Sequence, residues 1–121
     1  MTKRKSTGGR SRPSRGRRAH EKDGYAIEPI VGTASSRPIG RRGGHTTSGL
    51  IFADFANVSD SSGKASKSKI LRVKKSPAKR DYERRGVITR GAVLETEAGE
   101  AVVTSRPAAD GVVNAVLTAK K

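Results

Sequence analysis

The sequence has no cysteine and no tryptophan, and only 3% of its 121 residues are aromatic. Without cysteine, the chain has no disulfide framework and no thiolate metal site. So few aromatic rings argue against a surface that stacks a row of single-stranded bases. No apolar run approaches the roughly 20 residues that span a bilayer, and the start of the chain lacks the apolar segment of a secretory signal. We therefore expect a soluble intracellular protein without a membrane partner.

A catalytic or metal-binding arrangement is lacking as well. The glycine-rich stretches 6–10 and 41–50 do not fit a Walker-type phosphate loop, because no lysine follows a glycine at the required spacing. His20 and His45 lie in basic, unpatterned sequence with too few carboxylates nearby to complete a metal site. The glutamates within 95–100 are expected at a solvated turn rather than in acid–base chemistry. We predict no enzymatic activity, no cofactor, no bound metal and no small-molecule substrate.

Positive charge is what the chain has in excess. Its 26 lysines and arginines outnumber 11 acidic residues, which gives a net charge of +15. Residues 1–49 carry twelve basic and three acidic residues, residues 50–80 carry eight and two, and residues 81–121 carry six of each. Such a surplus opposes compaction and is relieved by a polyanion, usually nucleic acid, with an anionic membrane surface as the weaker alternative. The distribution predicts a neutral folded body with a basic arm and a basic middle.

Short apolar runs from residue 50 onward predict β-structure. Six runs have the length of strands and are separated by breaks rich in Gly, Pro and Ser: 50–58, 68–75, 86–89, 92–97, 100–105 and 112–117. Between them, residues 77–85 predict a short helical turn with Ser76 as its cap. We predict an all-β body over residues 50–121, a small six-stranded antiparallel barrel or sandwich. The barrel is favoured because closure removes exposed strand edges.

Residues 1–49 are predicted to be a long, irregular basic arm. They show no sustained apolar period and cannot offset their own ordering entropy, so we expect them to be disordered alone and ordered on RNA. Lys3–Arg18 holds six arginines and two lysines with glycines between them. Guanidinium groups bind phosphate bidentately, and glycine lets the backbone approach it. A targeting signal or a histone-like tail is a weaker hypothesis, because basic character continues through 64–80 and no long amphipathic helix follows.

The residues predicted to bind RNA are mostly basic or glycine residues of the arm, together with four arginines at strand ends or in loops of the body. They are Lys3, Arg4, Lys5, Thr7, Gly8, Gly9, Arg10, Arg12, Arg15, Arg17, Arg18, Arg41, Arg42, Gly43, Gly44, Arg84, Arg85, Arg90 and Arg106. For the four body arginines, ordinary surface pairing with Asp81, Glu83 or Glu95 is an equally weighted alternative.

Several short motifs occur in a characteristic order along the chain. They include KRKSTGGR (3–10), FANV (55–58), Ile88-Thr89-x-Gly91-Ala92, Glu95-Thr96-Glu97-x-Gly99, Thr104-Ser105-Arg106-Pro107 and Asp110-Gly111-x-Val113-Asn114. With them, the chain resembles the small-subunit ribosomal protein eight family of archaea and eukaryotes, the "S-eight-e" proteins. The archaeal form fits best, because the chain is short and lacks the long insertion of eukaryotic members.

The resemblance implies a six-stranded barrel with an extended N-terminal arm. It also implies a structural constituent of the small ribosomal subunit, bound to the 5′ domain of small-subunit rRNA in the body of the subunit. We then expect a role in translation in the cytoplasm, neighbouring ribosomal proteins as partners, and no homo-oligomer. A ribosome-assembly factor or a regulatory RNA-binding module on the same fold is the alternative, because residues 45–49 lack the basic residues that the family commonly has there.

Overall fold

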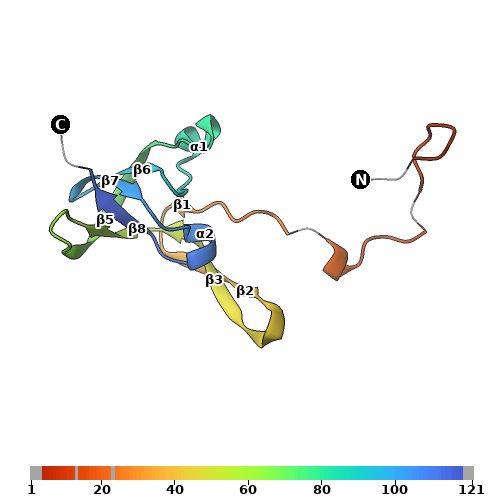
Figure 1. The fold of residues 1–121 in the computed structure, drawn as a ribbon, viewed down its shortest axis with the longest axis horizontal. Coiled ribbons are helices and arrows are strands. Elements are labelled where there is room, and N and C mark those ends of the chain that lie inside the picture. The colour runs from red at the N-terminus through yellow and green to blue at the C-terminus, as the bar shows by residue number, and fades with distance from the viewer. Residues whose placement is uncertain (1–3, 13, 23, 119–121) are drawn as a thin grey trace.

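The computed structural model describes residues 4–12, 14–22 and 24–118. Within these residues the chain forms eight strands, two short α-helices and two 3-10 turns (Figure 1). In chain order they are η1 (Ala19–Glu21), β1 (Ile30–Val31), β2 (Ser35–Gly40), η2 (Arg42–Gly44), β3 (Thr46–Ala53), β4 (Phe55–Ser59), β5 (Ala65–Lys75), α1 (Arg80–Arg85), β6 (Val93–Thr96), β7 (Gly99–Val103), α2 (Pro107–Asp110) and β8 (Asn114–Leu117). The strands form one closed barrel and one small sheet.

The barrel has the strand order β4-β5-β6-β7-β8 and is closed by β8 against β4. That closing pair is parallel, with Val58 opposite Ala115, whereas the other four pairs are antiparallel. The predicted barrel is thus present, but it closes with five strands and is not wholly antiparallel. The run 86–89 is not among its strands, because a left-handed Gly86 ends α1 and a turn begins at Thr89, which leaves too few residues for a ladder.

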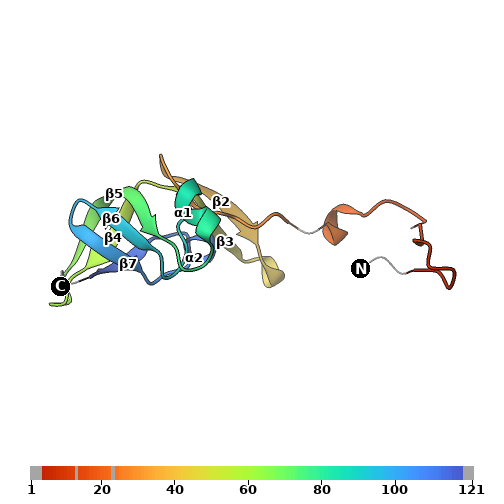
Figure 2. The same cartoon turned by 90° about the horizontal axis from the view of Figure 1, so that it is seen from above.

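The second sheet has the order β1-β3-β2, with β3 parallel to β1 and antiparallel to β2. Figure 2 shows β2 and β3 side by side, projecting beside the barrel. Its strands begin earlier than the sequence predicted, and the predicted domain boundary at residues 49 and 50 falls inside β3. The predicted run 50–58 is divided at Asp54 between β3 of this sheet and β4 of the barrel. The sequence did not predict β2, because most of the side chains of this strand are exposed and form no apolar pattern. Pairing with β3, rather than burial of an apolar face, therefore specifies this strand.

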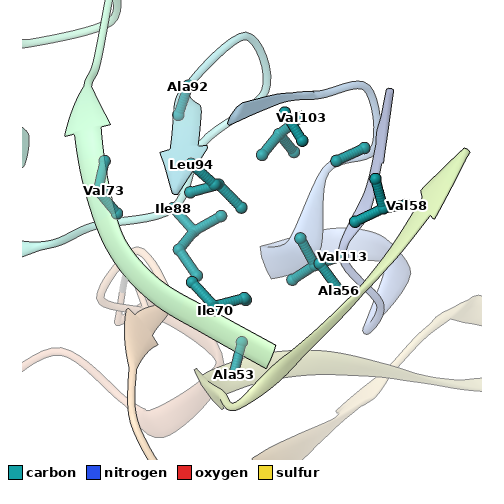
Figure 3. Packing of buried hydrophobic residues seen from close by; sticks show 12 residues of the cluster. Ala53, Ala56, Val58, Ile70, Val73, Ile88, Ala92, Leu94, Val103 and Val113 are labelled. Atoms are coloured by element: carbon teal, nitrogen blue, oxygen red, sulfur yellow. The ribbon is translucent and has the colours of Figure 1, made fainter. Parts of the chain in front are cut away.

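The barrel interior is filled by small and β-branched side chains (Figure 3). The cluster consists of Ala53, Ala56, Val58, Ile70, Val73, Ile88, Ala92, Leu94, Ala101, Val103, Val113 and Ala115. On β4 these positions alternate with exposed ones, as a strand with one buried face requires. The four aromatic residues of the chain all lie outside this cluster. A five-stranded barrel is narrow, which explains why its core uses alanine and valine.

The helix α1 begins later than predicted, and Ser76 is not its cap. Lys79 precedes the first helical residue and makes no capping side-chain hydrogen bond. Ser76 is buried instead, and its backbone N–H donates to Glu83 Oε1 at 3.0 Å. Its hydroxyl oxygen lies 3.4 Å from Thr89 Oγ1. Ser76 therefore joins the end of β5 to α1 and to the turn that follows it.

The segment before β1 is attached to the barrel next to α1. The buried Pro29 accepts a hydrogen bond from the Ile88 N–H at 2.7 Å. Glu28 accepts hydrogen bonds from the Tyr82 hydroxyl at 3.2 Å and from the Arg85 guanidinium. We call Glu28, Tyr82 and Arg85 the Glu28 clamp. Upstream of it, the chain runs away from the barrel (Figure 1).

The helix α2 lies very close to β3, and two glycines permit the contact. A Cβ atom on the buried Gly49 would lie 2.4 Å from the Ala108 carbonyl oxygen. Gly111 has a φ of 73°, and a Cβ atom there would lie 2.6 Å from the Ser48 carbonyl oxygen. Both contacts are with backbone atoms, so they cannot be relieved by turning a side chain. β3 of the small sheet thus approaches α2 so closely that neither glycine position has room for a side chain.

Replacing Gly49 with alanine should force α2 and β3 apart. We expect Gly49→Ala to lower the free energy of unfolding by about 1–3 kcal/mol, as overpacking does in well-packed cores, measured by urea unfolding followed by circular dichroism. Gly40→Ala on β2 is the matched control, because its added Cβ would meet no atom within 4 Å. Equal stability of the two variants would contradict this account of the contact.

The Glu28 clamp should make stability depend on pH. The Arg85 guanidinium, helped by the Tyr82 hydroxyl, lowers the pKa of Glu28 in the folded protein. The stabilisation is then fully present above the unfolded pKa of about 4.3 and is lost as the pH falls through the lower folded value. We expect Glu28→Gln to flatten the acid limb of stability measured by urea unfolding at several pH values.

Glu21→Gln is the control for that measurement. The Glu21 pKa is also lowered, chiefly by its hydrogen bond with Arg15, but the two residues are exposed and only six apart in sequence, so we expect their pair to form whether or not the barrel is folded. Its acid limb should therefore match that of the unmodified protein. A Glu28→Gln variant with an unchanged acid limb would show that the clamp does not stabilise the fold.

Candidate nucleic-acid interface

The first predicted basic cluster is folded into a tight loop. The Lys5 N–H donates to the Gly9 carbonyl at 2.9 Å, and the Gly8 N–H donates to the Lys5 carbonyl at 2.9 Å. Gly8 has a φ of 82°, which a side chain would disfavour, so this turn requires glycine. The residues around it, including Arg4 and Arg10, are exposed. The loop thus displays several cations on a short hydrogen-bonded turn, while the predicted Lys3 lies outside the described residues.

The next part of the predicted arm already contains an acidic partner. Arg15 donates two hydrogen bonds to Glu21, at 2.7 and 2.6 Å, and the Arg18 N–H donates to the same carboxylate at 3.1 Å. The Arg15 hydrogen bond lowers the pKa of Glu21. Exposed pairs of this kind contribute little to stability. A phosphate could therefore replace Glu21 at the Arg15 guanidinium at small cost.

The tip of the β2–β3 hairpin brings together the predicted residues 41–44. The Arg41 N–H donates to the His45 carbonyl at 2.7 Å, and Arg41 Nε donates to Thr47 Oγ1 at 3.1 Å. Gly43 and Gly44 follow one another with φ values of 77° and 76°. These glycines turn the chain back so that the arginines lie at the tip, which points away from the barrel (Figure 1). This tip can meet an anion without moving the barrel.

Strand β5 carries two kinds of cation on its outer surface. Arg72 pairs with Glu95 of β6, and Lys74 pairs with Glu100 of β7. Near the other end of the strand, the Lys67 Nζ lies 4.3 Å from the centre of the Phe55 ring and has no acidic partner among the described residues. The Lys69 side chain likewise makes no ion pair within the described residues. Arg72 and Lys74 are therefore neutralised, whereas Lys67 and Lys69 are not.

The four predicted body arginines divide in the same way. Arg84 pairs with Asp81 at 2.8 Å, and Arg85 belongs to the Glu28 clamp and lies 3.6 Å from Asp81. For these two, the alternative of surface pairing is observed. The side chains of Arg90 and Arg106 make no ion pair or hydrogen bond with the part of the chain that the structure describes. They line one largely apolar groove of about 270 Å³ beside α2.

Sequence analysis missed some unpaired cations and one aromatic ring. Lys67 and Lys69 lie in the basic middle, but nothing in the sequence separates them from Arg72, which has a partner. Arg37 was missed because its strand had no apolar pattern, yet its side chain is exposed and makes no ion pair in the described ranges. Tyr25 was missed because a single aromatic residue carries no spacing signal.

The described residues hold no group of three or more His, Asp or Glu side chains placed to bind a metal ion. No helix in the same residues is long and apolar enough to cross a bilayer. What the interface offers chemically is a set of guanidinium and ammonium donors on projecting turns. Such groups bind anionic oxygens and do so without bond-making chemistry.

Comparison with known proteins identifies the family. The model for ribosomal protein S8e matches residues 1–118. The small ribosomal subunit protein eS8 of Methanocorpusculum labreanum is 44% identical over 94% of this chain and 92% of its own length. Those of Methanoregula boonei and Sulfolobus acidocaldarius are 40% and 41% identical, covering 96% and 94% of this chain and 94% and 91% of their own lengths. These archaeal relatives confirm the predicted resemblance, and the chain belongs to the ribosomal protein S8e family.

Proposed function

We propose that this protein is a structural constituent of the small ribosomal subunit that binds and stabilises small-subunit rRNA and so supports translation in the cytoplasm. The family match over residues 1–118 carries the proposal, and the relatives are named as small-subunit proteins. The resemblance favours the 5′ domain of the rRNA, in the body of the subunit. Neighbouring ribosomal proteins complete the set of partners, and the role needs no catalysis or cofactor.

Cations without acidic partners would make the rRNA contacts. They lie on separate projections of the molecule, so together they suit the irregular surface of folded RNA, which proteins read through its shape and backbone. Within the described residues, those of the predicted list are Arg4, Lys5, Arg10, Arg12, Arg18, Arg41, Arg42, Arg90 and Arg106, joined by Arg37, Lys67 and Lys69. Glu95 and Glu100 neutralise the opposite part of the barrel. That part faces away from the RNA in our proposal.

The segment upstream of Glu28 serves as the rRNA-binding arm in this proposal. Its loop around Gly8 brings Lys5 and Arg10 to phosphates as a preformed unit. Arg15 exchanges Glu21 for phosphate when the arm is laid on RNA, since an exposed carboxylate and a phosphate compete for the same guanidinium fork. The Glu28 clamp then fixes the point at which the arm leaves the body.

The division of cations along β5 gives a direct test of the rRNA contact. Lys67→Gln/Lys69→Gln and Arg72→Gln/Lys74→Gln each remove two positive charges from one strand. We expect the first variant to bind a small-subunit rRNA fragment more weakly and to reduce the slope of log affinity against log salt by about 1.5 in total. The second should bind nearly as the unmodified protein does, because its cations are already paired.

The two variants also separate specific contacts from net charge. Equal losses of affinity would mean that overall charge alone drives binding, and the proposed face would be wrong. If the unmodified protein bound with an affinity that did not change between low and moderate salt, the rRNA-binding function itself would be contradicted.

The alternative of an assembly factor can be tested on particles from cells. Residues 45–49 lack basic side chains, which leaves room for a role other than permanent residence in the subunit. We expect the protein to co-sediment with mature small subunits in a stoichiometric amount, measured by mass spectrometry of gradient fractions. Its presence only in precursor particles would support the assembly factor instead.

A further inference from the structure

A second hollow lies between the segment upstream of β1 and the β2–β3 hairpin, on the other side of Ile27 from the groove of Arg90 and Arg106. Its volume is about 440 Å³, within the roughly 300–1,000 Å³ of small-ligand sites. Ile27 and Ile39 supply apolar surface to its wall, and none of the described residues that line it is acidic. The hollow therefore suits a ligand that is partly apolar and carries negative charge.

Tyr25 lines this hollow and has no evident structural role. Its side chain is 97% exposed, and it makes no hydrogen bond or ring contact with the described part of the chain. The other tyrosine, Tyr82, is half-buried and donates to Glu28. An aromatic ring left open at the edge of a hollow is available to stack on a planar group.

Two arginines line the same hollow. Arg37 makes no ion pair within the described residues, and Arg41 is held only by the neutral hydroxyl of Thr47, through Nε. The terminal nitrogens of both guanidinium groups are thus available to an anionic oxygen. Because Arg37 lies on β2 and Arg41 at the start of the hairpin tip, the paired strands fix their spacing.

We propose that this hollow binds one unpaired nucleotide of the rRNA, with its base stacked on Tyr25 and its phosphates contacted by Arg37 and Arg41. The inference rests on the proposed rRNA-binding function and names a site within it. A nucleotide has a planar base, which suits Tyr25, and an anionic phosphate, which suits Arg37 and Arg41. Sequence-specific RNA recognition commonly uses unstacked bases laid on an aromatic ring or a guanidinium group. An acidic peptide would satisfy the arginines but would leave the ring without a stacking partner.

Substitutions at Tyr25 and Arg37 separate stacking from charge. We expect Tyr25→Ala to weaken binding of the full-length protein to a small-subunit rRNA fragment by about 5- to 150-fold. The salt slope should stay unchanged, because the ring is neutral. Tyr25→Phe keeps the ring and should bind like the unmodified protein. Arg37→Gln should instead reduce the salt slope by about 0.7 to 0.9.

The tyrosine fluorescence of the protein gives a second, direct measurement. The chain has two tyrosines and no tryptophan. In Tyr82→Phe, Tyr25 is therefore the only tyrosine, and stacking of a base on it should quench its emission when the rRNA fragment is added. A mixture with an RNA duplex lacking unpaired bases should leave the emission nearly unchanged.

The outcomes also distinguish this inference from the proposed function. The nucleotide site would be overturned if Tyr25→Ala bound rRNA as tightly as the unmodified protein and the emission of Tyr82→Phe were not quenched. Salt-dependent rRNA binding, and with it the proposed function, would then remain. A Tyr25→Ala loss confined to association with a ribosomal protein would also overturn the nucleotide site, in favour of a peptide. Absence of salt-dependent rRNA binding in the unmodified protein would remove the proposed function and the site together.

Discussion

The hydrogen bond from the Ile88 amide to the Pro29 carbonyl joins the upstream chain to the barrel, and the placement of the interface depends on it. Both residues are buried, and an unpaired buried amide or carbonyl costs about 1–3 kcal/mol. The Glu28 clamp lies beside this bond, and its side-chain hydrogen bonds attach the same segment of the chain to α1. Because β1 follows directly, the bond places β1 against β3, and through β3 it orients the hairpin that carries Arg41. The neighbourhood of Tyr25 is set by the same anchor.

The outer surface of the barrel shows how acidic residues can make the charge of a body uneven. β5 carries cations near both ends of its outer surface, and the acidic residues Glu95 of β6 and Glu100 of β7 neutralise Arg72 and Lys74 only. The field of the barrel is then asymmetric, because residues 50–80 carry eight basic and two acidic residues, whereas residues 81–121 carry no net charge. A polyanion is attracted to the surface of Lys67 and Lys69 and gains little at Arg72 and Lys74. In the proposed complex, the acidic residues would thus help to orient the barrel on RNA, because they neutralise the cations on the part that does not contact it.

The sequence was informative where a strand buries an apolar face and uninformative where pairing or charge partners decide. The runs behind β5 to β8 alternate or are apolar, and all four strands form. β2 has almost no buried side chain, so nothing in its composition predicts it. The parallel closure of β8 on β4 depends on residues such as Val58 and Ala115, which are far apart in the chain. The basic residues and glycines around Gly8 were predicted to belong to an irregular arm, and their hydrogen-bonded turn was not predicted. The pairing of Arg72 with Glu95 required the register of two strands.

The parallel pairing of β4 with β8 also bears on how the protein folds. Asn57 and Asn114 are register partners that are 57 residues apart in sequence, and their side chains are hydrogen-bonded at 3.1 Å. Contacts of such separation form late, because the entropy of closing the intervening loop must be overcome first. Until β8 docks, β4 has an unpaired edge that can recruit other strands. The local β2–β3 hairpin forms without that closure, so the chain can acquire the hairpin that carries Arg37 and Arg41 while its barrel is still open.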